Sequence, residues 1–208
     1  MTPDMAFLIP AFVTLFVVID PIGLAPMFVA LTQGADAAHR RSVALRSCFI
    51  AIVLLTLFGL FGEAVLGFVG ISMPAFRIAG GILLFLTALE MLFERRSKRR
   101  KGQVTDQTDP SVFPLATPLI AGPGSIATMI LLTGQQDGWA GVFMIHIVMA
   151  VVILAVLVLF LASGILERLL GDTGINVVSR LLGMLLAALS VQFVLDGLSS
   201  FGLGANLG

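Results

Sequence analysis

The sequence contains few charged residues and a single cysteine, and each shortage excludes certain classes of protein or site. Asp, Glu, Lys and Arg make up 12% of the 208 residues, whereas a soluble domain carries about 25%. Hydrophobic residues make up 58%, and the mean hydropathy is +1.08, so water is not the main solvent of the folded chain. The lone cysteine, Cys48, excludes an intrachain disulfide and a cysteine-cluster metal site, and we expect no bound metal.

The sequence also lacks the combinations of residues that catalysis requires. It has two histidines, His39 and His146, no HExxH or GxSxG motif, and no base close in sequence to Ser125. It has no P-loop motif, so direct coupling to ATP is not expected. We therefore expect no enzymatic activity and no cofactor. Residues 1–5 contain no Lys or Arg, so we expect the first apolar segment to be kept rather than removed as a signal peptide.

Six segments are apolar over roughly the 20 residues that a helix needs to cross a bilayer. They cover residues 6–31, 47–69, 73–93, 112–133, 139–163 and 175–198. The sequence therefore predicts an all-α membrane protein with six transmembrane helices. We expect residues 1–208 to form one membrane domain, with a first half over 5–93, a connecting loop over 94–110 and a second half over 111–198.

Positively charged residues fall on one side of these six spans. The segments after the first, third and fifth spans contain Arg40, Arg41, Arg46, Arg95, Arg96, Lys98, Arg99, Arg100, Lys101 and Arg168, and those after the second and fourth contain no Lys or Arg. Because Lys and Arg gather in cytoplasmic segments, we place the basic loop 94–110 in the cytoplasm and both termini outside. A basic run such as 95–101 can also bind nucleic acid or anionic lipid. Its position directly after a span favours a topological role, and we expect no nucleic-acid partner.

The two halves of the sequence show a weak internal repeat. An offset of 102 pairs Pro21 with Pro123, Ala25 with Ala127 and Met27 with Met129, and an offset of 103 pairs Arg77 with Arg180, Gly80 with Gly183 and Leu86 with Leu189. Each half has three spans, and because three is odd, the second half enters the membrane inverted. We therefore predict two inverted three-helix repeats, the arrangement that secondary transporters use. Chance similarity between apolar segments is the alternative explanation.

Helix-breaking residues interrupt the first and fourth predicted spans. They are Asp20-Pro21-Ile22-Gly23 and Gly122-Pro123-Gly124-Ser125. An Asp followed by Pro is typical of a helix start, because Asp accepts from free N–H groups and Pro has no N–H to leave unpaired. Such breaks are tolerated in a membrane only where protein or a water-filled cavity satisfies the backbone. We therefore predict discontinuous helices 1 and 4, with half-helix N-termini that meet near the bilayer midplane.

Two converging helix N-termini form a site for a small charged solute. Each presents unpaired N–H groups and about half a positive charge, which suits a carboxylate. Asp20 supplies the opposite sign and can receive an ammonium group or a proton, and these two requirements together describe an amino acid. The predicted substrate-binding residues are Asp20, Pro21, Gly23, Gly122, Pro123, Gly124, Ser125 and Thr128. The alternative is that both breaks are structural kinks and that Asp20 is only a helix cap.

Four other polar residues lie within or near the predicted spans. Arg77 and Arg180 are candidates for gating or ion pairing, and the alternative is that they are anchors at the membrane boundary. Glu63 is expected near the outer boundary, where it can meet Arg77. His146 is a candidate proton relay, because the pKa of histidine lies near neutrality, and a packed histidine with a hydrogen bond is the alternative.

Three stretches of the sequence resemble a known family. Residues 18–32 (VIDPIGLAPMFVALT), 114–126 (PLATPLIAGPGSI) and 77–81 (RIAGG) resemble the MarC-related family of integral membrane proteins, which is also classed as six-span neutral amino acid transporters. The similarity runs over residues 6–198. The resemblance implies an inner-membrane protein whose substrates are small neutral amino acids such as glycine and alanine.

We therefore expect a secondary transporter of a small neutral amino acid, driven by a proton or sodium gradient or by neither. Its partners are the substrate, the lipid bilayer and any coupling ion, and an oligomeric assembly is compatible with this function. The alternative is a passive channel for water or a small neutral solute, because two positive half-helix ends also suit a pore that rejects cations. The sequence has no Asn at either break, which argues against an aquaporin-like pore.

Overall fold

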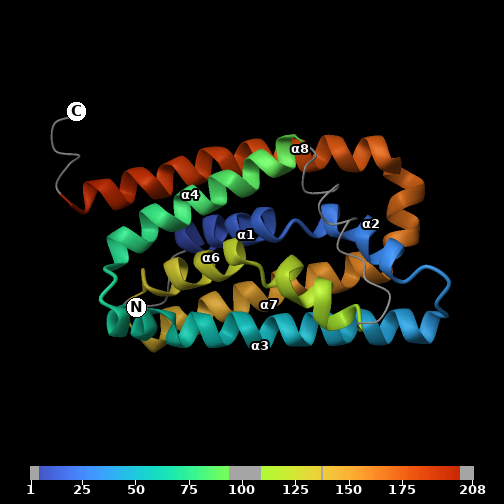
Figure 1. Cartoon of the computed structure of the whole chain (residues 1–208), viewed down its shortest axis with the longest axis horizontal. Helices are drawn as coiled ribbons and strands as arrows, with labels where there is room; N and C mark the ends of the chain where they lie inside the picture. The colour runs from blue at the N-terminus through green and yellow to red at the C-terminus, as the bar shows by residue number, and fades with distance from the viewer. Residues whose placement is uncertain (1–4, 94–108, 137, 202–208) are drawn as a thin grey trace.

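The computed structural model describes residues 5–93, 109–136 and 138–201, and these residues form helices and short connections with no strand (Figure 1). The elements in chain order are α1 (Met5–Ile19), α2 (Pro21–Leu31), α3 (Ala37–Val69), α4 (Met73–Leu92), η1 (Ser111–Ile120), α6 (Pro123–Thr133), α7 (Trp139–Leu161) and α8 (Ser163–Ser199). Five helical spans are long and apolar enough to cross a membrane, and the bent pair η1–α6 makes a sixth. The predicted all-α membrane fold is confirmed, with six spans when the bent pair counts as one.

The helices form an elongated bundle with its broken spans in the middle (Figure 1). Along one edge α4 packs against α8, and along the other α3 packs against α7. The broken spans α1–α2 and η1–α6 lie between these two pairs, and α1 packs against α6. Both breaks are therefore enclosed by protein rather than by lipid, as a break in a membrane helix requires.

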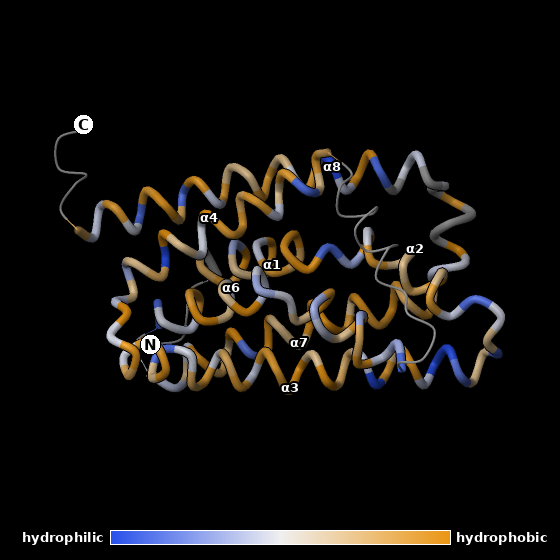
Figure 2. Tube along the Cα trace, in the orientation of Figure 1, coloured by the Kyte–Doolittle hydropathy of each residue, from blue (hydrophilic) through white to orange (hydrophobic). Residues whose placement is uncertain are grey.

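The outer surface of the bundle is apolar along its length. Phe49 on α3 and Phe143 on α7 are 67% and 66% exposed. Figure 2 shows hydrophobic colouring along the middle of the helices and hydrophilic colouring mainly toward their ends. Such continuous exposure of large apolar side chains is unfavourable in water and is what a helix facing hydrocarbon needs.

Helix α3 is longer than the sequence predicts. It begins at Ala37, ten residues before the expected start of the second span at residue 47, because the Asp36 side chain accepts a hydrogen bond from the His39 N–H at 2.7 Å. The helix has 33 residues, about 50 Å, which exceeds the hydrocarbon thickness of roughly 30 Å. Hydropathy marks the part of a helix in hydrocarbon, and it does not mark a capped extension beyond it. Arg40 and Arg46 therefore lie on a helix and not in a loop.

The connection between the fifth and sixth spans is also helical, where the sequence predicts a loop over residues 164–174. Helix α8 starts at Ser163 and turns at Gly171, whose φ of 60° and ψ of 177° are open to glycine but costly for other residues. The transmembrane part of this helix is Asn176–Ser199. Most of the predicted basic loop, residues 94–108, lies outside the described residues.

Small residues allow α4 and α8 to pack closely. A Cβ on Gly81 would lie 2.8 Å from the backbone oxygen of Ser190 and 2.8 Å from the Val194 side chain. A Cβ on Gly183 would lie 3.0 Å from the Cβ of Met91. Small residues at such contacts let two helix backbones approach each other, which is a common means of packing helices in membranes.

We expect Gly81→Ala to destabilise the protein by about 1–3 kcal/mol, the usual cost of overpacking a close contact. The added methyl group would press on a backbone oxygen of α8, which cannot rotate away. The matched control is Gly67→Ala in α3, where a Cβ would have no neighbouring heavy atom within 4 Å. Melting temperatures of both variants in detergent test this prediction. Equal melting temperatures would contradict the close packing of α4 on α8.

Candidate functional site

The first break is a single residue that ends α1 and begins α2. The Asp20 N–H donates to the Phe16 oxygen at 2.9 Å, and the Asp20 carbonyl accepts from the Leu24 N–H at 3.0 Å. Asp20 has φ 55° and ψ 63°, in the left-handed region that Asp tolerates better than most residues. The chain therefore stops one helix and starts another without an intervening loop.

The Asp20 carboxylate folds back onto the start of α2. Its Oδ1 accepts a hydrogen bond from the Gly23 N–H at 3.0 Å, and Asp20 is only 2% exposed. A Cβ on Gly23 would collide with Oδ2 of Asp20, so this position requires glycine for the carboxylate to lie there. A buried carboxylate within a span is costly and is usually retained for a function.

The second break bends the chain by 53° between η1 and α6. Gly122 is the N-cap of α6 and has no side chain to cap the helix. The Ser125 hydroxyl takes this role: it accepts from the Gly122 N–H at 3.1 Å and donates to the Ile120 oxygen at 2.6 Å. Within η1 the backbone is extended at Phe113 and Thr117, and each precedes a proline, which disfavours the helical conformation.

The two breaks lie side by side. A Cβ on Gly124, in the first turn of α6, would lie 3.2 Å from Val18 Cγ1, 3.4 Å from Leu84 Cδ2 and 3.7 Å from Thr87 Oγ1. Val18 lies in the last turn of α1, two residues before Asp20. The N-terminus of α6 therefore packs against the C-terminus of α1 and the middle of α4.

The breaks bring helix ends of opposite polarity together. The last carbonyl groups of α1 carry partial negative charge, and the first N–H groups of α2 and α6 carry partial positive charge. By helix geometry, the N–H groups of Gly124 and Ser125 are not used within α6. Such an arrangement can bind a carboxylate at the N–H groups and an ammonium group at the carbonyls and the Asp20 carboxylate. It can therefore hold both charges of a zwitterion.

The other predicted binding residues belong to the same two half-helices. Pro21 and Pro123 are the first residues of α2 and α6. Thr128 is fully buried, and its hydroxyl donates to the Gly124 oxygen at 2.9 Å. Because the hydroxyl protons of Ser125 and Thr128 are both directed to backbone carbonyls, a ligand would meet these hydroxyls as acceptors.

The predicted gating residues lie farther from the breaks. Arg77 precedes Leu84 by seven residues on α4, about 10 Å along the helix, and its Nε is buried without a hydrogen-bond partner. Glu63 is exposed on α3, and it forms no ion pair with Arg77 in the described part of the chain. Arg180 is exposed on α8. The expected contact between Glu63 and Arg77 is therefore not made in this conformation.

His146 lies at the interface of α3 and α7. Its Nδ1 is 2.7 Å from the Val142 oxygen, so this nitrogen carries the proton, and its Nε2 is buried without a partner. A Cβ on Gly59 would lie 2.9 Å from that Nε2. His146 also lines a cavity of about 440 Å³ between α3 and α7, together with Thr56 and Trp139. The residues of this cavity include none from the two breaks.

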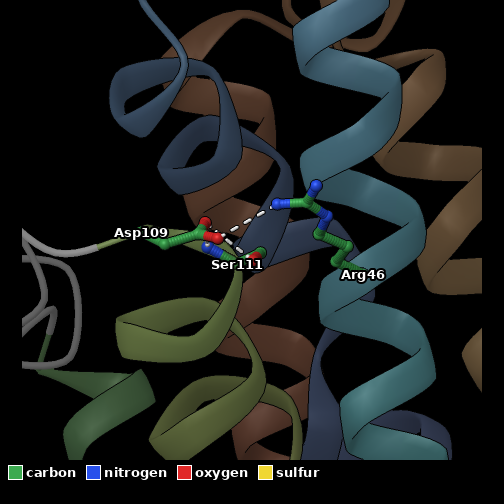
Figure 3. Close-up of polar contacts among 3 residues, drawn as sticks. All are labelled: Arg46, Asp109 and Ser111. Atoms are coloured by element: carbon green, nitrogen blue, oxygen red, sulfur yellow. Dashed lines mark hydrogen bonds and ion pairs between the residues drawn. The ribbon is translucent and has the colours of Figure 1, made fainter.

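A polar contact among Asp109, Ser111 and Arg46 holds the start of the second half against α3 (Figure 3). No pattern in the sequence predicts this contact. Asp109 Oδ1 accepts from the Ser111 N–H at 3.0 Å and from its hydroxyl at 2.7 Å, and Arg46 lies 3.3 Å from Oδ2. The hydrogen bonds from Ser111, with a smaller contribution from Arg46, lower the pKa of Asp109. Because this pKa is lowered on folding, the carboxylate stabilises the folded chain at neutral pH, and the contribution is lost on acidification through the lowered pKa.

Comparison with known proteins identifies the family of the chain. The model of the family described as MarC family integral membrane protein matches residues 5–201. A UPF0056 membrane protein of Methanocaldococcus jannaschii is 34% identical over 200 residues, which cover 94% of this chain and 97% of the relative. The UPF0056 inner membrane protein YhgN of Escherichia coli K12 is 34% identical over 193 residues, which cover 92% and 95%. No solved structure gives a significant match.

We expect Gly23→Ala to remove the hydrogen bond between Asp20 and the start of α2, because the methyl group would displace the carboxylate. Loss of an N-cap costs about 0.5–2 kcal/mol, so the melting temperature in detergent should fall. Gly164→Ala is the matched control, since a Cβ there would have no heavy atom within 4 Å. Asp20→Asn keeps the capping oxygen and should be milder than Gly23→Ala. A Gly23→Ala protein as stable as the Gly164→Ala control would show that the cap does not stabilise the break.

Proposed function

The chain belongs to the MarC family of integral membrane proteins, and from this premise we propose that it is a secondary transporter of small neutral amino acids such as alanine or glycine. It is an integral, multi-pass membrane protein. The relative from E. coli is named an inner membrane protein, and we assign this chain to the inner membrane as well. The basic loop then faces the cytoplasm and both termini lie outside.

The observation that carries the proposal is the pair of adjacent helix breaks. Secondary transporters bind their substrates where discontinuous helices meet, with half-helix N-termini directed at anionic groups and unwound carbonyls at cations. Here α6 begins against the last turn of α1, with the Gly124 Cβ position 3.2 Å from Val18. A buried carboxylate, Asp20, lies two residues farther along the chain.

The chemistry of these groups matches an α-amino acid. Its carboxylate would accept from the first N–H groups of α6, and its ammonium group would face the Asp20 carboxylate and the last carbonyls of α1. The residues at the breaks are small or have small polar side chains: Gly23, Gly124, Ser125 and Thr128. A small neutral side chain fits such a lining better than a large or charged one.

The packing of the bundle supports two inverted repeats. Two pairs of corresponding elements pack on one another, α3 on α7 and α4 on α8, and α2 packs on α7 and α8 as its counterpart α6 packs on α3 and α4. A two-fold axis that exchanges the two halves would pass between paired elements of this kind. The broken spans α1–α2 and η1–α6 run in opposite directions through the bundle (Figure 1). Exchange of two such halves between equivalent conformations is the basis of alternating access.

A passive channel is the second candidate, because two positive half-helix ends at mid-depth also repel cations. Counterflow separates the two functions. Proteoliposomes loaded with unlabelled alanine should accumulate labelled alanine transiently if the protein is a transporter. A channel would equilibrate the label without accumulation.

We expect proteoliposomes that contain the protein to take up labelled alanine or glycine, and Asp20→Asn to reduce this uptake. Loss of a charged hydrogen-bond partner costs about 1.5–3 kcal/mol, so the initial rate at low substrate concentration should fall roughly 10- to 100-fold. Asp36→Asn is the matched control, because Asp36 caps α3 in the same way, 2.7 Å from the His39 N–H, away from the breaks.

Proton and sodium gradients, imposed separately, identify the coupling ion. If no small neutral amino acid enters the vesicles under any gradient, the proposed substrate class is wrong. If Asp20→Asn transports with unchanged affinity and ion dependence, Asp20 serves only as a helix cap.

We expect Gln135→Cys to react from outside the cell and Ala38→Cys only from the cytoplasmic side. Both positions are exposed, and they lie between α6 and α7 and at the start of α3. The substitutions are made with Cys48→Ser, which removes the one native cysteine. A membrane-impermeant thiol reagent is applied to intact cells and to inside-out vesicles. The reverse pattern of labelling would overturn the orientation.

A further inference from the structure

A cluster of two phenylalanines and an arginine closes the bundle beyond the first break. The rings of Phe28 on α2 and Phe160 on α7 are stacked, with centroids 4.5 Å apart and an angle of 9° between their planes. The guanidinium of Arg40 lies 5.7 Å from the centroid of Phe28. Arg40 also donates to the Ser163 hydroxyl at 3.3 Å. Phe28, Phe160 and Ser163 are all buried.

The cluster joins three separate segments of the chain. Phe28 lies near the end of α2, Arg40 near the start of α3, and Phe160 and Ser163 where α7 meets α8. Helix α2 has 11 residues and is separated from α1 by Asp20 alone. Because α2 does not continue α1, a rotation of α2 about this one-residue joint would not require α1 to move. The cluster holds the end of α2 that lies away from Asp20.

The repeat-related contact at the opposite end of the bundle is built differently. At the offset of 102, Phe28 corresponds to Ile130 on α6, and Phe160 corresponds to Phe58 on α3. Ile130 packs directly against Gly62, one helical turn after Phe58, where a Cβ would collide with it. This contact has neither a ring stack nor a cation over a ring. The two ends of the bundle are therefore closed by contacts of unequal chemistry.

We propose that Phe28, Phe160, Arg40 and Ser163 form the cytoplasmic gate of the transporter, shut in this conformation. This inference rests on the proposed function and deepens it. Opening toward the cytoplasm requires Phe28 to leave Phe160 and Arg40, so that α2 swings away from the junction of α7 and α8. An aromatic stack and a cation over a ring each contribute a modest free energy, and together they bias a two-state equilibrium by roughly tenfold toward the closed form.

Cysteine accessibility behind the cluster tests this gate without knowledge of the substrate. Ala25→Cys, made together with Cys48→Ser, places one thiol on α2 between Asp20 and Phe28, at a position that is 0% exposed. The probe is 2-sulfonatoethyl methanethiosulfonate, which does not cross the bilayer, applied to inside-out vesicles for the cytoplasmic face and to intact cells for the outer face. We expect slow modification with the gate intact and a roughly tenfold higher rate after Phe160→Ala or Arg40→Gln.

Two matched controls distinguish a gate from general loosening. Phe143→Ala removes a ring from the bilayer-facing side of the same helix α7, and Arg41→Gln removes a neighbouring exposed guanidinium. Both should leave the modification rate unchanged. Phe160→Ala could unfold the protein, and size-exclusion chromatography detects this. In that case Arg40→Gln and Phe160→Leu replace it in the test, because Phe160→Leu leaves a smaller cavity than Phe160→Ala.

The outcomes distinguish a failure of the proposed gate from a failure of the proposed substrate class. Equal modification rates in gate and control variants would overturn the gate. Faster modification from the outer face alone would overturn its cytoplasmic position. Faster modification from the cytoplasmic face supports the gate even where alanine and glycine are not transported, and in that case only the proposed substrate class fails.

Discussion

Each break in a membrane-spanning helix must satisfy the backbone groups that it releases, because hydrocarbon offers them no partner. This constraint explains which residues lie at the centre of the bundle. The N-terminus of α2 is capped by the Asp20 carboxylate, and the N-terminus of α6 is closed by the Ser125 hydroxyl, which also takes the Ile120 carbonyl as its acceptor. The long helices α3, α4, α7 and α8 surround these ends, so the breaks are shielded from lipid. The bundle therefore cannot be uniformly apolar at these breaks, which is why we place the proposed solute site there.

Each break uses one side-chain oxygen to cap the half-helix that follows it, but the positions of the glycine and of the residue that supplies the oxygen are exchanged. In the first half the capping oxygen belongs to Asp20 at the N-cap, and the third residue of the helix is Gly23. In the second half the N-cap is Gly122, and the oxygen belongs to Ser125, the third residue of the helix. One of these oxygens belongs to an ionisable carboxyl group and the other to a hydroxyl group. The centre therefore has one carboxyl side chain beside two helix N-termini with partial positive charge, and with that carboxyl group ionised these charges would match the zwitterion of the proposed substrate.

The sequence predicts the spans and both breaks well, because hydropathy and the prolines at positions 21 and 123 act locally. It misses the early start of α3, where Asp36 caps a helix beyond the hydrocarbon, and the helical corner that turns at Gly171. It also misses the stack of Phe28 on Phe160. These rings are 132 positions apart, and two phenylalanines in apolar segments give no sign that they face each other. Contacts between spans depend on helix rotation, which the sequence of one span does not fix.

Close packing at the second break would link substrate size to conformational change in the proposed transporter. At Gly124 even a methyl group would already be in contact with Val18, Leu84 and Thr87. A solute that reaches the first N–H groups of α6 must therefore separate α6 from α1 and α4 at this point. The larger the solute, the greater the separation and the greater the packing that is lost. Glycine at this position thus keeps this conformation compact, and in the proposed transporter it would favour a small solute, because a small solute displaces the fewest of these contacts.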